Sequence, residues 1–454
     1  MTDRRFGRLR RRARLAGLTA RRGADLAATR TRSITADATR RAELDEGFAI
    51  RSAEDAAREL GHMKGAVMKL GQMLSFVGDG LPPEARAALA QLQSDAPPMA
   101  PSLAADVVRA ELGGDPTELF ATWEPVPVAA ASIGQVHRAT LADGRAVAVK
   151  VQYPGIEQAI GSDLADGARI GALLSAVTLK SVDVAALAEE VRHRMLDELD
   201  YRIEARHQQE FADRLAGHPF LHVPAVVPER SGRRVLTSEW ADGLSFAEFD
   251  GGATDAARQR AAEALFRFAQ QSIVRDGVFN GDPHPGNYRF APDGRVTLLD
   301  FGLVKRLGPD EHEGLMHLLD GVLADDAEAT TAAMVHAGFL AADHGLDPDH
   351  VFACVSAPYR AYFDDVFTFT PAYVGDALRS LLDVRGPYAD VLAALDMPPS
   401  FVLLDRVVWG VSALLGTLGA TNRWRAIVLG YRTDGLAPAT PLGEQEAAWR
   451  ASSP

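Results

Sequence analysis

Two short stretches that lie close together in the chain decide the fold: GDPHPGN at residues 281–287 and LLDFG at residues 298–302. The first is a polar loop whose prolines and glycines hold its backbone shape, and it places Asp282 and Asn287 five residues apart. The second ends a short apolar strand on Asp300. Phosphoryl transfer needs a carboxylate that orients the attacking hydroxyl and oxygen ligands that hold Mg²⁺. The stretches therefore predict Asp282 as a catalytic residue, and Asn287 and Asp300 as metal ligands.

Working outward, a lysine and two glutamates are candidates for the remaining parts of such a site. The segment AVAVK at residues 146–150 is predicted to be a strand that ends in Lys150, one of only five lysines among 48 basic residues. The segment ELDYRIE at residues 198–204 is predicted to be helical. Glu198 and Glu204 are six residues apart, so they point to different faces of that helix. One of them is expected to pair with Lys150 while the other reaches metal, and the spacing does not choose between them.

The order of these residues along the chain is that of the protein-kinase signature set: Lys150, a helical glutamate, Asp282, Asn287 and Asp300. A strand pair predicted within residues 223–238 runs into Glu239-Trp240-Ala241. There the backbone of Glu239 and Ala241 is expected to contact adenine, as a kinase hinge does. Strands come first and helices follow, which favours a predominantly helical α+β protein with two lobes. The cofactors predicted are ATP and Mg²⁺.

Two features of ordinary kinases are missing. No G-x-G-x-x-G precedes Lys150, and VAAASIG at residues 128–134 stands in its place. Alanine lacks the freedom of glycine at positive φ, so this loop should approach phosphates differently. No A-P-E segment follows Asp300, so neither an ordinary activation loop nor a peptide platform is expected. The chain also has no G-K dipeptide, which excludes a Walker A loop.

Composition restricts the class of protein. The chain has 454 residues, and at 47% hydrophobic it can bury a large core. Its single cysteine, Cys354, excludes an intramolecular disulfide framework and a multi-cysteine zinc site. The apolar stretch at residues 407–420 is too short to span a membrane and is predicted to be a buried helix. The N-terminus lacks the apolar core of a secretory signal, so a cytoplasmic setting is expected.

Charge is distributed unevenly between the N-terminal arm and the rest of the chain. Residues 1–41 contain 13 arginines and three acids and sum to +10, so the remaining residues sum to −23. Such an arm predicts peripheral contact with an anionic membrane surface, on the inner membrane face. The alternative is a solvated arm without a partner. Its only aromatic residue is Phe6, so no nucleic-acid partner is expected.

Pattern and composition divide the chain into five parts. Apolar residues at steps of three and four between 60 and 77 form one helical stripe, and Lys69 and Gln72 fall on the opposite face. Two further short helices are predicted at 84–95 and 101–113. The five parts are a basic arm (1–45), a helical extension (46–125), an N-lobe (126–240), a C-lobe with a helical C-terminal part (241–436) and a tail (437–454).

The chain resembles the UbiB family, the aarF-domain-containing atypical kinases linked to quinone biosynthesis. The resemblance covers about residues 50–330. Its most specific marks are the K-x-G-Q motif at Lys69-Leu70-Gly71-Gln72, the alanine-rich loop, and the E-x-D motif at Glu198 and Asp200. One departure is Asn280, which stands where many kinase-like proteins have a histidine two residues before the aspartate.

The resemblance implies a bilobal protein-kinase-like fold with a helical N-terminal extension, and it assigns roles within the site. Lys69 and Gln72 would face the nucleotide pocket and block a peptide-substrate site. The implied catalytic residues are Asp282, Lys150 and either Glu198 or Glu204. The implied nucleotide-binding residues are Ala129, Ala130, Ala131, Ser132, Lys150, Glu239, Ala241, Lys69 and Gln72. The implied metal ligands are Asn287, Asp300 and Asp200.

For the whole protein, the resemblance implies a Mg-ATP-dependent atypical kinase or ATPase that supports quinone or isoprenoid-lipid metabolism. Its expected partners are a nucleotide and an isoprenoid lipid or quinone precursor. One alternative is a small-molecule phosphotransferase of the aminoglycoside or choline kinase type, whose loop is similar to residues 281–287, although the K-x-G-Q helix speaks against it. The other is a non-catalytic, nucleotide-gated scaffold at a membrane, which the alanine loop and missing activation segment allow.

Overall fold

The computed structural model describes residues 99–131, 133–157, 197–382, 386–396 and 398–452. Contacts group the chain into two compact units, one of residues 100–129, 136–152 and 178–454, and another of residues 1–99, 130–135 and 153–177. In the second unit, the backbone N–H of Tyr153 donates to the carbonyl of Ile133 at 2.9 Å. The predictions for the basic arm, the K-x-G-Q stripe and the helix at 84–95 lie outside the described residues.

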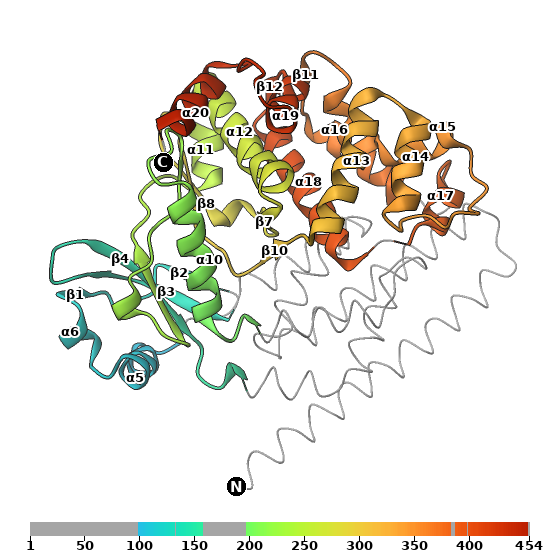
Figure 1. The fold of residues 1–454 in the computed structure, drawn as a ribbon. Helices are drawn as coiled ribbons and strands as arrows, with labels where there is room; N and C mark the ends of the chain where they lie inside the picture. Colours follow the sequence, from blue (N-terminus) through green and yellow to red (C-terminus); the bar gives the residue numbers. More distant parts are fainter. Residues whose placement is uncertain (1–98, 132, 158–196, 383–385, 397, 453–454) are drawn as a thin grey trace, which may run out of the picture. The chain divides into compact units, whose positions relative to one another are not determined.

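A five-stranded sheet forms the first lobe (Figure 1). Its strands run in the order β1-β3-β4-β6, and β2 pairs with β3. On β4, Val147, Val149 and Val151 are fully buried, and Lys150 lies on the opposite face because side chains alternate along a strand. The bounds are β1 Thr122–Trp123, β2 Ala129–Ala131, β3 Gly134–Thr140, β4 Ala146–Gln152 and β6 Val235–Glu239, preceded by α5 Pro101–Leu112 and α6 Pro116–Leu119. The predicted strand at 146–152 and the predicted helix at 101–113 are therefore confirmed.

The predicted strand at residues 223–227 is wrong. This segment forms only an isolated bridge, Val226 to Ser238, alongside β6. Pro224 lies within it and Pro228 follows it, and proline has no backbone N–H to donate to a ladder. The segment stays irregular, and β6 pairs instead with β4, in a register that places Lys150 opposite Leu236.

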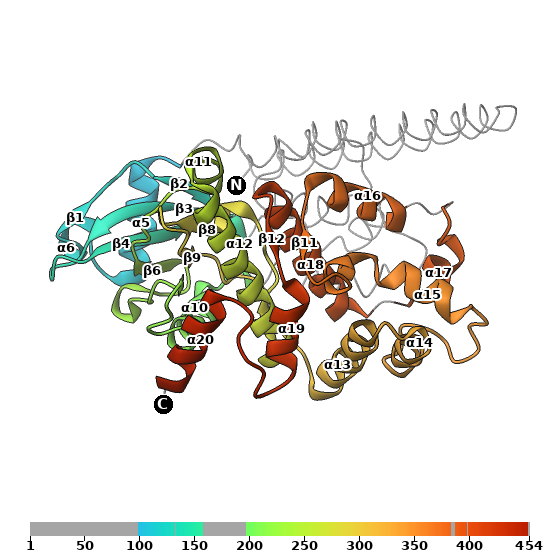
Figure 2. The same cartoon turned by 90° about the horizontal axis from the view of Figure 1, so that it is seen from above.

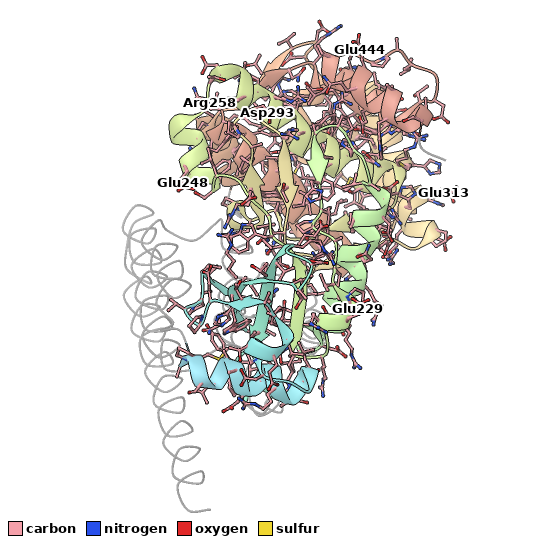
Figure 3. All side chains as sticks on the ribbon, turned by 90° about the vertical axis from the view of Figure 1, so that its left-hand side faces the viewer. Glu229, Glu248, Arg258, Asp293, Glu313 and Glu444 are labelled. Carbon is pink, nitrogen blue, oxygen red and sulfur yellow. The ribbon has the colours of Figure 1, made fainter. Side chains whose placement is uncertain are left out.

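Two small sheets flank the predicted catalytic loop, residues 281–287, because β7 ends just before it and β8 begins just after it. β8 and β9 form a hairpin and pair antiparallel. Its turn places Gly294 at φ 86°, a value that favours glycine, beside Asp293 in Figure 3. β5 lies parallel to β9, and β7 pairs with β10. Their bounds are β5 Leu221–His222, β7 Val278–Asn280, β8 Tyr288–Phe290, β9 Val296–Leu298 and β10 Val304–Arg306.

Helices make up most of the second lobe (Figures 1 and 2). α12 is buried along most of its length because other helices of this lobe pack around it. It continues into a π-helical turn, η3 Gln271–Arg275, which leads directly to β7. α18 contains residues 407–417 of the stretch 407–420 that was predicted to be a buried helix. The main helices are α10 Tyr201–Arg214, α11 Phe246–Gly252, α12 Asp255–Gln270, α13 Pro309–Ala324, α14 Ala327–His336, α15 Pro348–Val355, α16 Pro371–Leu382, α17 Ala389–Ala394, α18 Pro399–Thr417, α19 Trp424–Arg432 and α20 Pro441–Ser452.

Short elements complete the lobe. The 3-10 turns are η2 Pro228–Arg230, η4 Pro285–Asn287 and η5 Ala357–Tyr362, and β11 Phe367–Thr368 pairs with β12 Thr421–Asn422. Across the described ranges, no helix has both the length and the apolar character needed to cross a membrane.

The predicted tail at residues 437–454 is wrong, because most of it folds as α20. Glu446 of this helix is only 1% exposed and binds Arg267 of α12 and the hydroxyl of Tyr431 on α19. α20 is thus attached to the core through a buried carboxylate. A stripe of apolar residues would have predicted this helix from the sequence. α20 is attached mainly through one buried glutamate, which no sequence pattern distinguishes from an exposed one.

Candidate functional site

An ion pair joins the sheet to α10. Lys150, on β4, donates through Nζ to both carboxylate oxygens of Glu204 at 2.8 and 2.9 Å. Its Nζ also lies 3.5 Å from Oδ2 of Asp300. The Lys150 and Glu204 side chains are only 15% and 8% exposed. The structure therefore selects Glu204, and not Glu198, as the glutamate that pairs with Lys150.

Burial and charge act against each other on this pair. Burial raises the pKa of Glu204 to about 7, although the charge of Lys150 opposes this shift. For Lys150, burial opposes the charged form, but the carboxylates of Asp300 and Glu204 outweigh it and raise the pKa. The lysine is therefore held as a cation where it can bind an anion.

The catalytic loop is held together by its own side chains. Asn287 donates through Nδ2 to the carbonyl of Asp282 at 3.1 Å and to its Oδ2 at 2.9 Å. Asn280 accepts from the backbone N–H of Asp282 at 3.0 Å and donates to the carbonyl of Asp300. The asparagine that departs from the usual histidine thus ties the loop to Asp300, and the structure brings Asp282, Asn287 and Asp300 into one network.

The segment after β9 fixes Asp300 and α10 together. Gly302 donates its backbone N–H to Oδ1 of Asp300 at 2.9 Å. Phe301 is fully buried, and its ring lies 4.9 Å from that of Phe211 on α10. His207, also on α10, contacts the carbonyl of Phe301 through Nδ1 at 3.3 Å. These contacts hold α10 inward, where Glu204 reaches Lys150.

Two residues of the site were not predicted from the sequence. The ammonium of Lys150 lies 5.1 Å from the centre of the buried Tyr201 ring, a cation–π contact. Arg406, on α18, donates through Nη2 to Oδ1 of Asp282. Tyr201 lies inside the motif at 198–204 but has no distinguishing spacing. Arg406 is 124 residues from Asp282, so no local pattern connects the two.

The E-x-D residues are placed differently from the prediction. α10 begins at Tyr201, so Glu198 and Asp200 precede the helix instead of lying on it. Asp200 is its N-cap and accepts from the backbone N–H of Arg202 at 3.1 Å. The Arg202 side chain also binds Asp200, at 2.6 Å. These contacts make Asp200 a capping residue and do not support its predicted role as a metal ligand.

The remaining nucleotide-binding predictions stay predictions. Glu239 ends β6, and the backbone N–H of the next residue, Trp240, donates to the carbonyl of Ala146 at 3.0 Å, which continues the pairing of β6 with β4. Ala129, Ala130 and Ala131 form β2. Ser132, Lys69 and Gln72 lie outside the described residues.

The residues fit a magnesium nucleotide by the chemistry of their donors. Within the described ranges, no three His, Cys, Asp or Glu side chains are grouped to hold a metal by themselves. Magnesium bound with a nucleotide needs only one or two protein oxygens, since phosphates and water complete its shell. Asn287 uses its amide nitrogen on Asp282, which leaves its oxygen for such a ligand. Among the residues that the structure describes, the buried hydroxyl of Tyr201 has no hydrogen-bond partner.

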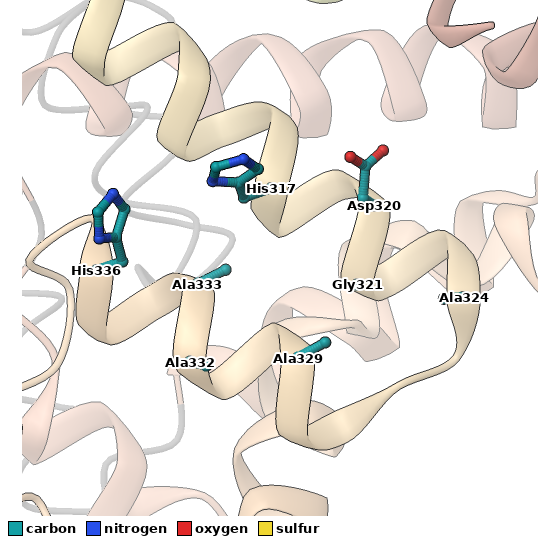
Figure 4. Close-up of a pocket in the computed structure, with 8 residues that line it drawn as sticks. All are labelled: His317, Asp320, Gly321, Ala324, Ala329, Ala332, Ala333 and His336. Carbon is teal, nitrogen blue, oxygen red and sulfur yellow. The ribbon is translucent and has the colours of Figure 1, made fainter.

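A groove between α13 and α14 is separate from this site (Figure 4). Its volume is about 480 Å³, and Asp320 on its rim is bound by Arg432 at 2.6 Å. It shares no residue with the Lys150 and Asp282 cluster. The lining residues are His317, Asp320, Gly321, Ala324, Ala329, Ala332, Ala333 and His336.

Comparison with known proteins gives the family. Residues 91–334 match the model of the ABC1 atypical kinase-like domain. The chain belongs to the ABC1 atypical kinase-like family, the UbiB family. The predicted family is therefore confirmed, and Lys150, Glu204, Asp282, Asn287 and Asp300 all lie within the matched residues.

Several ABC1 relatives are similar to this chain. An uncharacterized protein of Synechocystis is 34% identical over 58% of this chain and 67% of its own length. The chloroplastic ACTIVITY OF BC1 COMPLEX KINASE 3 of Arabidopsis thaliana is 30% identical over 75% of this chain and 47% of its own length. This chain therefore spans about half to two thirds of the length of these relatives.

A solved structure supports the fold directly. The Rv3197–erythromycin complex from Mycobacterium tuberculosis matches 82% of this chain and 95% of that chain, with a TM-score of 0.62 and 31% identity. The predicted α+β kinase-like fold is therefore confirmed for this ABC1-family protein.

Proposed function

We propose that this ABC1-family protein is a Mg-ATP-dependent atypical kinase or ATPase. The observation that carries the proposal is a single connected network. Lys150 binds Glu204 at 2.8 Å and approaches Asp300 at 3.5 Å, and Asn280 links Asp300 to the loop that holds Asp282 and Asn287. Each part of this network has a role in phosphoryl transfer.

The roles follow from the contacts. Lys150 binds nucleotide phosphates as a cation, and Glu204 holds its ammonium in place. Asn287 and Asp300 supply oxygen ligands for Mg²⁺, which, when bound, neutralises charge on the phosphates. Asp282 orients the attacking hydroxyl or water and accepts its proton. A site of this kind works by position and electrostatics, which is consistent with its many internal hydrogen bonds.

For the substrate class, we propose an amphiphilic small molecule such as a quinone precursor or an isoprenoid lipid. Only six residues separate Gly302 from Pro309, where α13 begins, so the chain has no long segment to bind a peptide at this point. One relative of known structure was solved in complex with erythromycin. This complex supports a small-molecule ligand for the proposal.

The test is turnover of Mg-ATP by the full chain. Asp300→Asn should reduce ATP hydrolysis at least about 100-fold, because it removes the charged metal ligand. The matched control is Asp320→Asn on α13, which lies outside the network and should retain activity. Equal activity of wild type and Asp300→Asn would contradict the proposal.

One observation favours the small-molecule phosphotransferase as the second candidate. The Mycobacterium tuberculosis relative was solved with a small molecule bound. A screen of quinone precursors, isoprenoid alcohols and hydroxylated soluble acceptors separates the candidates by product. Phosphorylation of a soluble acceptor without lipid favours the phosphotransferase, and lipid-stimulated release of phosphate favours the ATPase. Nucleotide binding with no turnover under any condition favours the scaffold.

A further inference from the structure

α18 packs directly against the catalytic loop through two residues one turn apart. Arg406 donates through Nη2 to Oδ1 of Asp282. Gly410 lies four residues further on the same face. A Cβ atom at Gly410 would meet Cγ of Pro283 at 2.3 Å, so only glycine allows this approach. The helix therefore touches two consecutive residues of the loop, one by charge and one by close packing.

The ion pair between Arg406 and Asp282 is largely removed from water. The two side chains are 10% and 18% exposed. Burial lowers the pKa of Arg406, and the charges of Asp282, Glu198 and Asp300 oppose this shift. The guanidinium thus binds Asp282 and also feels the charges of Glu198 and Asp300. An exposed ion pair contributes little, but one partner left alone in a buried pair is costly, so this contact constrains both residues.

The contact fixes Asp282 in one orientation. Its Oδ1 accepts from Arg406 and its Oδ2 accepts from Asn287 at 2.9 Å, so the carboxylate is held at both ends. Each carboxylate oxygen has two acceptor sites, so Asp282 can still accept from a hydroxyl. The six-residue connection from Gly302 to Pro309 holds the start of the loop, because the carbonyl of Leu303 accepts from the backbone N–H of Gly281 at 2.7 Å.

We propose that Arg406 is a positioning residue for Asp282, and that α18 braces the catalytic loop at Asp282 and Pro283. The inference rests on the proposed phosphoryl-transfer function. It assigns to the C-terminal part of the chain an effect on the chemical step that is larger than its effect on nucleotide binding, since Arg406 holds the carboxylate of Asp282.

The expected effect is on kcat. Arg406→Met should lower kcat about 10- to 100-fold, the cost of a misplaced reacting group, with KM for Mg-ATP changed less than about threefold. Arg406→Lys should restore part of the loss, because it keeps a cation but not the planar fork. The control is Arg432→Met, which removes an arginine–aspartate pair on α19 and α13 and should retain kcat.

A double variant decides whether Arg406 acts through Asp282. Asp282→Asn alone and Asp282→Asn with Arg406→Met should have the same kcat, because the second change then has nothing left to position. If the loss of kcat in the double variant equals the product of the losses in the two single variants, the inference is overturned, because Arg406 would then act on the substrate by itself. An unchanged kcat in Arg406→Met would also overturn the inference. So would an increased kcat, because the contact with Arg406 would then hold Asp282 in a less active position.

Gly410→Ala is a second variant that keeps Arg406 and its charge. Its added methyl group pushes α18 away from Pro283, and it should lower kcat in the same way with little change in Mg-ATP affinity. Wild-type kcat in Gly410→Ala would contradict the bracing role of α18. If the wild-type protein binds but never turns over nucleotide, the proposed function fails and this inference fails with it. If wild type is active and both variants match it, only this inference fails.

Discussion

At the scale of single residues, the choice between two glutamates shows what spacing alone cannot decide. Glu198 and Glu204 both lie in the segment that was predicted to be helical, and either could have paired with Lys150. The structure starts α10 at Tyr201, so Glu204 lies on the first turn and reaches the lysine at 2.8 Å. Asp200 fixes this start as the N-cap, which is why the helix cannot extend back to Glu198.

Glu204→Gln should lower kcat/KM for Mg-ATP about 10- to 100-fold, because a buried lysine loses its charged partner. Steady-state ATP hydrolysis measures the change. Glu210→Gln is the matched control, since Glu210 lies on the same helix but pairs with Arg214 and Arg306 near the surface. Similar losses in both variants would show that the effect comes from α10 as a whole.

Asp405 should make stability depend on pH. Burial raises its pKa to about 6, against a hydrogen bond from Trp409 that lowers it. As pH rises from about 4 to 6, the unfolded chain releases this proton first, so ionised Asp405 destabilises the folded protein above pH 6. Asp405→Asn should therefore raise the free energy of unfolding by about 2 kcal/mol at pH 8 and by less at pH 5.

Urea unfolding at the two pH values measures this difference. Asp434→Asn, at a highly exposed aspartate, is the control and should change stability at neither pH. A gain of equal size at pH 5 and pH 8 would show that the ionisation of Asp405 is not its cause.

At the scale of elements, the sequence pattern correctly predicted the helices and strands that depend on residues close together in the chain. The strand at 146–152, the hairpin at Asp293-Gly294 and the helix at 101–113 follow from alternation, turn residues and flanking prolines, and all three are present. The errors at 223–227 and in the tail have a different origin. The first was apolar but interrupted by prolines, and the second is held by partners about 180 residues away in sequence.

Glu446→Gln should destabilise the protein by about 3–5 kcal/mol, because Arg267, with Arg450 and Tyr431, would lose a buried charged partner. Urea unfolding of the full chain measures the loss. The matched control is Glu444→Gln, an exposed residue on the same helix (Figure 3), which should be neutral. If both variants destabilise the protein equally, the loss of stability comes from the lower helix propensity of α20 and not from the buried charge of Glu446.

The same carboxylate should weaken the fold in acid. Burial opposes ionisation of Glu446, but the neighbouring His218 and the charges of Arg450 and Arg267 outweigh it and lower the pKa. Its contribution to stability is therefore present above the ordinary glutamate pKa and is lost as pH falls below it. Glu446→Gln should remove part of the acid sensitivity seen in urea midpoints between pH 5 and pH 3.

At the scale of the whole molecule, the sequence predicted the class of fold and most of the site. The order of Lys150, Asp282, Asn287 and Asp300 was sufficient, because these residues occur in short motifs whose spacing is visible. Arg406 was not predictable in this way. It reaches Asp282 only because α18 folds back onto the loop, and a contact across 124 residues leaves no local trace.

The charge asymmetry of the chain leads to a prediction of its own. Deleting residues 1–41 should weaken binding to vesicles of anionic lipid, because the arm carries +10 and the remainder −23. Vesicle co-sedimentation at low salt measures the loss, and binding of the full chain should fall as salt rises. Neutral vesicles are the control. Equal binding of the full and shortened chains would show that residues 1–41 do not contribute to membrane binding.

The position of Arg406 has a consequence for how the protein can be divided. The family model ends at residue 334, whereas the cation that holds Asp282 lies on α18, far beyond that boundary. An expression clone that ends at residue 334 would contain every motif named above yet lack the helix that touches the catalytic loop. It would also uncover the face of α12 on which α18 packs. Inactivity of such a fragment would therefore say nothing about the motifs it contains.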